Sequence, residues 1–164
     1  MHANERILQA ARSWLGVPYR KAGRDRRRGV DCLNYVGQCF LQAGISHSLP
    51  AWRNYEYGFW KAPGDVILAA IEDGLRLLGS EVEVEEYQSL GRADWRPGDL
   101  VCVSQMEGLN KATHAVIVES VTSHSVRILH ARQGSGGCVE STRMPPSWRM
   151  IRLYRFLGWE APAK

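Results

Sequence analysis

The chain has 164 residues, of which 45% are hydrophobic, and this suits one compact domain over residues 1–164. A domain of about 150 residues buries roughly two thirds of its unfolded surface, so it needs no disulfide framework or structural metal. The net charge of +4 is uneven: residues 1–30 hold eight Lys or Arg against two acids, and such a basic end could face nucleic acid, a membrane surface or a cell wall.

The sequence carries no signature of a membrane span or a secretory signal. No stretch reaches the ~18 apolar residues of a span, and the N-terminus lacks the apolar core of a signal peptide. We therefore expect synthesis in the cytoplasm without a signal peptide, with any export by another route. None of the four cysteines forms a CxxC pair, which argues against a zinc knuckle, and we expect mostly reduced thiols.

Helices are predicted first along the chain and strands later. Helical periodicity with capping residues and terminal glycines indicates a helix from Asn4 to about Leu15, a helix over Cys32–Ala43 capped by Asp31, and a helix over residues 65–78. The period then changes to two, and the candidate strands are 81–87, 99–104, 114–121, 125–131, 137–142 and 149–156. Helices segregated from an antiparallel sheet indicate an α+β fold.

Cys32 is the strongest candidate for a nucleophile. It lies in the first turn of a predicted helix, where free backbone N–H groups and the helix dipole favour the thiolate and lower the thiol pKa. The same N–H groups could bind an oxyanion. We interpret the other cysteines, Cys39, Cys102 and Cys138, as structural, because free cysteine is most often a small buried residue.

A thiol nucleophile needs a base, and the base needs an orienting group. His114 opens one predicted strand and His130 lies late in the next. If the two strands form a hairpin about the turn at 122–124, the antiparallel pairing places the two imidazoles close together. A metal site built from these histidines and a cysteine lacks a short-spaced ligand pair, so neither metal nor cofactor is predicted.

These residues fall in segments that resemble the NlpC/P60 family of papain-like cysteine peptidases. The matching segments span residues 5–131 in the family's order: Trp14-Leu15-Gly16-Val17-Pro18-Tyr19, Gly29-Val30-Asp31-Cys32, Trp95-Arg96-Pro97-Gly98-Asp99-Leu100, Thr113-His114-Ala115-Val116 and Ile128-Leu129-His130-Ala131. The resemblance implies a papain-like α+β domain, with N-terminal helices packed on a mainly antiparallel sheet, that hydrolyses amide bonds in peptidoglycan stem peptides.

On that pattern Cys32 is the nucleophile, His114 the general base and acid, and His130 the orienting residue. Tyr19 and Asp31 are the predicted substrate-binding residues. The resemblance is greatest to the phage-tail or prophage branch, with phage-tail or secretion-system proteins as partners and a virion or cell envelope as the place of action. Two departures bear on substrate preference: Asn34 and Tyr35 replace small residues after the nucleophile and could narrow the pocket, and the segment 24–28 is rich in arginine.

Two other functional classes stay open. The same chemistry could serve a thiol amidase or acyltransferase on another substrate, because a fold does not fix a function. A non-enzymatic basic virion or nucleic-acid-binding module would use residues 24–28 with Arg143, Arg149, Arg152 and Arg155, but no nucleic-acid-binding motif accompanies them. The aromatic loop 52–60 is interpreted as core or lid packing, with cleft lining as the alternative.

Overall fold

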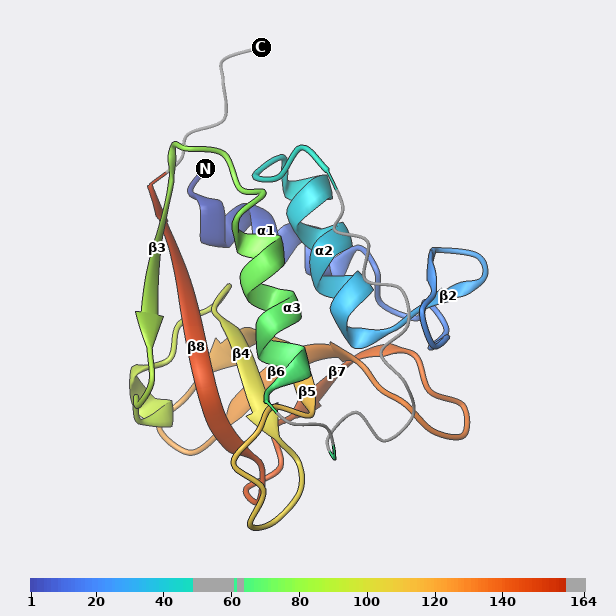
Figure 1. The fold of residues 1–164 in the computed structure, drawn as a ribbon, viewed down its shortest axis with the longest axis vertical. Helices are drawn as coiled ribbons and strands as arrows, with labels where there is room; N and C mark the ends of the chain where they lie inside the picture. The colour runs from blue at the N-terminus through green and yellow to red at the C-terminus, as the bar shows by residue number, and fades with distance from the viewer. Residues whose placement is uncertain (49–60, 62–63, 159–164) are drawn as a thin grey trace.

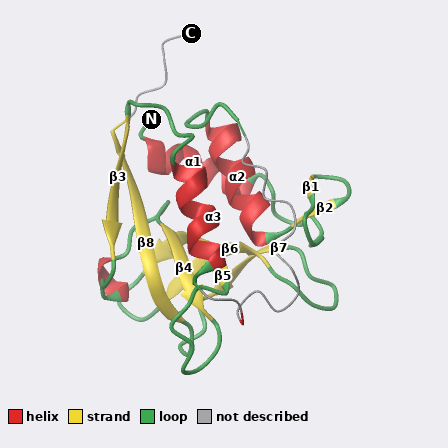
Figure 2. Cartoon of the chain, in the orientation of Figure 1, coloured by secondary structure: helices red, strands yellow, loops and turns green. Residues whose placement is uncertain are grey.

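The computed structural model describes residues 1–48, 61 and 64–158 and has an α+β architecture. Its helices are α1 (Ala3–Arg12), α2 (Cys32–Ala43) and α3 (Val66–Leu75). A six-stranded sheet contains β3 (Val82–Tyr87), β4 (Leu100–Ser104), β5 (His114–Val121), β6 (Val126–Ala131), β7 (Val139–Arg143) and β8 (Arg149–Gly158). The helices gather over one face of this sheet (Figures 1 and 2).

All neighbouring strands of the large sheet run antiparallel, in the order β3-β8-β4-β5-β6-β7. The last strand therefore lies between β3 and β4, while β4 to β7 follow one another. Alternating residues of each strand face opposite sides. Leu100 and Cys102 pack with the helices, whereas Val101 and Val103 belong to a second apolar cluster on the other face. This alternation explains the two-residue period of the sequence.

The start and end of α2 follow directly from the sequence, as predicted. The Asp31 carboxylate accepts a hydrogen bond from the Asn34 backbone N–H at 2.8 Å, which satisfies one free N–H of the first turn. Gly44 ends the helix in the left-handed conformation, with φ of 77°. Since Cys32 is the first residue of α2, this cap fixes the position of the sulfur.

The other predicted helices and the strands are present with shifted ends. The first helix is capped at His2 rather than Asn4, and α3 ends at Leu75, three residues before the predicted end. Each strand of the large sheet lies within two residues of its predicted bounds. Two short strands were not predicted: β1 (Arg24–Asp25) and β2 (Gly29–Val30) form a small hairpin in the arginine-rich segment. A short 3-10 helix over Arg92–Asp94 was not predicted either.

The segment before Cys32 is held closely against its neighbours. Val30 donates its backbone N–H to the Pro18 carbonyl at 2.9 Å, and Tyr19 donates to the Gly137 carbonyl at 2.9 Å. Gly29 has a φ of 123°, and a Cβ added there would lie 2.7 Å from the Pro18 oxygen. A glycine is therefore required at this position, and it lets the Tyr19 segment approach the start of α2.

Candidate active site

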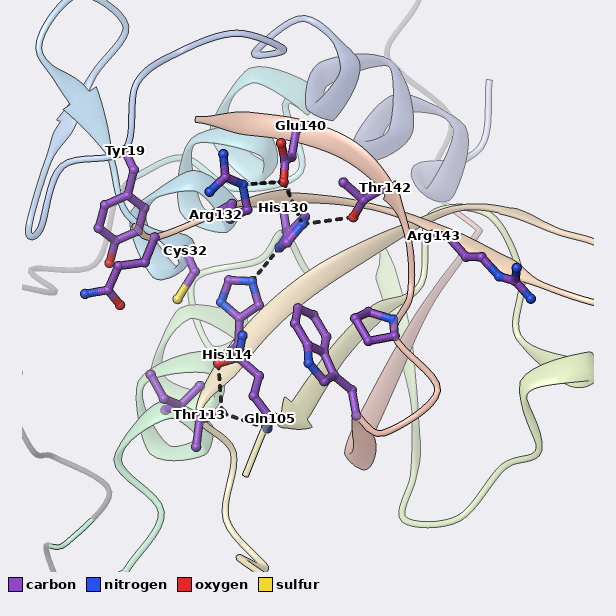
Figure 3. A pocket seen from close by; sticks show the side chains of 14 residues that line it. Tyr19, Cys32, Gln105, Thr113, His114, His130, Arg132, Glu140, Thr142 and Arg143 are labelled. Carbon is purple, nitrogen blue, oxygen red and sulfur yellow. Dashed lines mark hydrogen bonds and ion pairs between the residues drawn. The ribbon is translucent and has the colours of Figure 1, made fainter. Parts of the chain in front are cut away.

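A cleft of about 320 Å³ opens where the first turn of α2 meets strands β5, β6 and β7. Figure 3 shows the side chains that surround it. Four of the five residues predicted to form the site line this cleft: Tyr19, Cys32, His114 and His130. The sequence did not identify several others that also line it: Gln105, Thr113, Arg132, Gln133, Glu140, Thr142, Arg143, Pro145 and Trp148.

Cys32 is buried at the bottom of the cleft, with 5% of its surface exposed. Its sulfur points toward the His114 ring (Figure 3). Burial, and then the charge of Asp31, raise the pKa of the Cys32 thiol to about 12, although hydrogen bonds from backbone N–H groups of Ala115 and Leu33 act in the opposite direction. The prediction of a lowered pKa was therefore wrong: the helix N–H groups do favour the thiolate, but burial outweighs them.

The two histidines lie close together, as expected from the predicted hairpin, and are hydrogen-bonded to each other. Nε2 of His114 lies 2.8 Å from Nδ1 of His130. Burial and the neighbouring His130 lower the pKa of His114 to about 3, and burial lowers the pKa of His130 to about 4. Both rings are therefore neutral near neutral pH, and each carries one proton.

His130 also contacts β7, on the side away from His114. Its Nε2 lies 3.1 Å from the Thr142 hydroxyl and 3.8 Å from a carboxylate oxygen of Glu140. The Trp148 ring packs edge-on against both imidazoles, with centroid distances of 5.6 and 5.8 Å. The side chains of Cys32, His114 and His130 thus lie in a row that leads to β7, with the sulfur directed toward the His114 ring, and Trp148 packs against both histidines.

Asp31 is the predicted site residue that the structure does not bring to the cleft. It is fully buried, and its carboxylate accepts hydrogen bonds from Ala22 N–H and from the backbone and side chain of Asn34, at 2.8 to 3.0 Å. Asn34 and Tyr35 do not line the cleft either, since Asn34 bonds Asp31 and the Tyr35 hydroxyl donates to the Ala11 carbonyl. These three residues hold α2 in place rather than shape the pocket.

All four cysteines are free thiols, as expected. Cys39 and Cys102 are fully buried, and burial raises the pKa of each thiol. Cys138 is partly exposed but is not among the residues that line the cleft. Within residues 1–48, 61 and 64–158, no group of three His, Cys, Asp or Glu side chains is arranged to hold a metal ion.

Three of the arginines named for a nucleic-acid-binding surface make contacts within the protein. Arg26 stacks its guanidinium 4.1 Å from the Trp14 ring and donates to the Ser13 carbonyl. Arg155 is buried in an ion pair with Asp99, and Arg152 pairs with Glu86. The aromatic loop 52–60 lies outside the described residues, and no helix in the described part is long and apolar enough to cross a membrane.

Comparison with known proteins identifies a family and a fold. Residues 3–154 match the family Amidase_6, described as "Putative amidase domain". No curated protein matches the chain. A crystal structure of an N-acetylmuramoyl-L-alanine amidase from Bacteroides uniformis is similar in fold, with a TM-score of 0.50 and 13% identity over 94% of this chain and 99% of that one. At this identity the likeness shows the fold alone.

Proposed function

The chain belongs to this family of amidase domains, and on that premise we propose that it is a cysteine-dependent hydrolase of amide bonds in bacterial peptidoglycan. The observation that carries the proposal is the row Cys32–His114–His130 at the bottom of a cleft. Three further facts support it: the match to an amidase family, the fold shared with a muramoyl-alanine amidase, and the five segments that resemble NlpC/P60 peptidases. We assign the papain-like type of mechanism on the same basis.

The reaction begins with a neutral thiol and a neutral imidazole. Nε2 of His114 is bonded to His130, which leaves Nδ1 on the side of Cys32 (Figure 3). As the sulfur attacks the amide carbonyl, the thiol proton passes to Nδ1 of His114. The tetrahedral intermediate places its oxyanion among the N–H groups at the start of α2, with Tyr19 nearby in the cleft lining.

The second half returns the enzyme to its starting state. His114 gives the proton to the leaving nitrogen, the C–N bond breaks, and the acyl group remains on Cys32 as a thioester. Water then attacks the thioester, with His114 as the base. The products are a carboxylic acid and an amine, and the thiol regains its proton from His114.

His114 can serve as a base only in one tautomer of the histidine pair. Its Nε2 must carry the proton and donate it to Nδ1 of His130, so that Nδ1 of His114 has a free lone pair. His130 must then be protonated on Nε2, which donates to the Thr142 hydroxyl. The negative charge of Glu140, 3.8 Å from that nitrogen, favours this arrangement. Thr142 and Glu140 are therefore positioning residues.

The character of the cleft favours a peptide substrate over the alternatives. Its lining includes the polar side chains of Gln105, Thr113 and Gln133 together with Arg132 and Glu140, whereas an acyltransferase for long acyl chains needs an apolar groove. A phage-tail or secretion-system setting, and action in a virion or cell envelope, stay predictions. Between a thiol amidase and an acyltransferase on another substrate, the amidase acting on another polar amide is the one compatible with the same cleft.

The test is incubation of the purified protein with soluble peptidoglycan fragments, followed by mass spectrometry. We expect one new cleavage, and the product masses distinguish a stem-peptide bond from the amide that joins the peptide to the sugar. Cys32→Ala should lose activity by orders of magnitude. Cys138→Ala, which removes a thiol outside the cleft, is the matched control and should keep it. Equal activity in both variants would refute the proposal.

A further inference from the structure

Arg132 lies at the rim of the cleft and is held in a defined orientation. It directly follows β6, and its Nε is paired with a Glu140 carboxylate oxygen at 2.6 Å, across to β7. About 40% of the Arg132 side chain is exposed, against 26% for Glu140. The pair thus lies between the buried histidines and solvent, where a bound substrate would pass.

The contact with Glu140 uses only one edge of the guanidinium. Of the terminal nitrogens, Nη2 makes a long contact of 3.4 Å to the Gly136 carbonyl, and Nη1 has no hydrogen-bond partner among the described residues. In Figure 3 these two nitrogens point away from Glu140, toward the side of the cleft where Tyr19 lies. A guanidinium that is held at Nε and has its terminal nitrogens available can bind a carboxylate by donating two parallel hydrogen bonds.

The charges of the cleft favour an anionic ligand. Two arginines and one glutamate are its charged lining residues among those described, and the glutamate is already paired with Arg132. The other arginine, Arg143, points away from Cys32 in Figure 3, and its Nη2 lies 3.5 Å from the His124 carbonyl. Arg132 is therefore the cation that lines the cleft together with Cys32 and can meet a negative charge on the substrate.

We propose that Arg132, oriented by Glu140, is a binding site for a free carboxylate next to the scissile amide of the substrate. This inference rests on the proposed function and specifies the substrate class: acidic peptides with a free carboxylate are preferred over the same peptides with a carboxamide. A charged hydrogen-bonded pair at a partly exposed site corresponds to a preference of about tenfold, and at most about a hundredfold. The preference should weaken with added salt, because the site is open to solvent.

The first measurement compares kcat/KM for two peptides that differ only in carboxylate or carboxamide. The native chain should prefer the carboxylate, and Arg132→Gln should remove the preference, with kcat/KM falling by about tenfold more for the carboxylate peptide than for the carboxamide. Arg127→Gln is the matched control, because Arg127 also extends from β6 to β7, at Ser141, but lies outside the cleft. If Arg132→Gln lowered kcat/KM equally for both peptides, the inference would be overturned, and the role of Arg132 would be only to hold Glu140 in position.

The second measurement separates this inference from the proposed function. Binding of both peptides is measured by calorimetry to Cys32→Ala, alone and combined with Arg132→Gln. If the native chain cleaves neither peptide but Cys32→Ala binds the carboxylate form more tightly, and only when Arg132 is present, the binding site stands and the catalytic proposal fails. Equal affinity for the two peptides would refute the binding site whatever the activity.

Discussion

Two buried polar pairs lie in or beside the same sheet, and they differ in whether a polar atom is left free to meet another partner. Asp99, directly before β4, and Arg155, in β8, form two hydrogen bonds of 2.8 and 3.0 Å, and Asp99 also accepts a hydrogen bond from the Arg96 N–H. Arg155 further donates to the Asp94 carbonyl. In contrast, His114 and His130 are neutral, and one nitrogen of His114 faces the cysteine. A charged pair whose polar atoms are hydrogen-bonded within the fold stabilises the fold. A neutral pair that keeps one nitrogen free beside a cleft can exchange protons.

The largest effect should follow from removing the base. His114→Gln keeps a buried polar side chain but no group that can accept the thiol proton. We expect kcat/KM to fall by about a thousandfold or more, with little change in the free energy of unfolding. Steady-state kinetics and urea denaturation measure the two quantities. A variant with near-native activity would show that His114 is not the base.

The opposite behaviour is expected for the charged pair. Arg155→Met leaves Asp99 as a buried charge without its partner, and we expect the free energy of unfolding to fall by about 3 to 5 kcal/mol. The folded fraction should keep the native KM, because Arg155 does not line the cleft. Urea denaturation, with kinetics at a temperature where the variant is folded, checks this. A loss of activity without a loss of stability would contradict the comparison.

Acid should destabilise the protein through the histidine pair. Both folded-state pKa values, about 3 and about 4, lie below the ordinary value of 6.5, so the unfolded chain binds more protons as the pH falls from 6.5. The stability from the neutral rings is complete above pH 6.5 and declines below it, by up to about 1.4 kcal/mol per pH unit for each ring. Unfolding measured between pH 6.5 and 5 should show this slope, and His114→Gln should show about half of it.

The smallest effect is expected at the far end of the row. Thr142→Val removes the hydroxyl that accepts from Nε2 of His130 and should lower kcat by about threefold to tenfold, with KM unchanged. Thr142→Ser restores the hydroxyl and should recover most of the rate. If Thr142→Val and Thr142→Ser were equally impaired, packing rather than tautomer control would explain the effect.

Much of the row formed by Cys32, His114 and His130 could be predicted from the sequence, because the features that place these residues are local. Asp31 and Gly44 mark the ends of α2 and so place Cys32, and the short turn between β5 and β6 indicates that these two strands pair. The register that puts His114 and His130 on one face also needs a bulge between Val118 and Ser120, which shifts the pairing by one residue and was not predicted. The order of strands β4 to β7 follows from the same short connections. Periodicity of two was sufficient to locate every strand of the large sheet.

The surroundings of the row could not be predicted, because they depend on distant contacts. Glu140 and Thr142 reach His130 across the β6–β7 pairing, which follows a loop containing three glycines, and its length does not fix a register. Trp148 comes from the segment before β8. The raised pKa of Cys32 has the same origin, since burial depends on packing of the whole sheet against α2. Sequence spacing contains no measure of these interactions.

The central claim is that Cys32 becomes acylated, and the most direct measurement is to trap the thioester. The protein is mixed with the amide substrate it cleaves, quenched in acid during the first turnover, and analysed by intact mass and peptide mapping. We predict one acyl group on the peptide that contains Cys32, released by hydroxylamine and absent from Cys32→Ala. Acylation of another residue, or undiminished product formation by Cys32→Ala, would contradict the account.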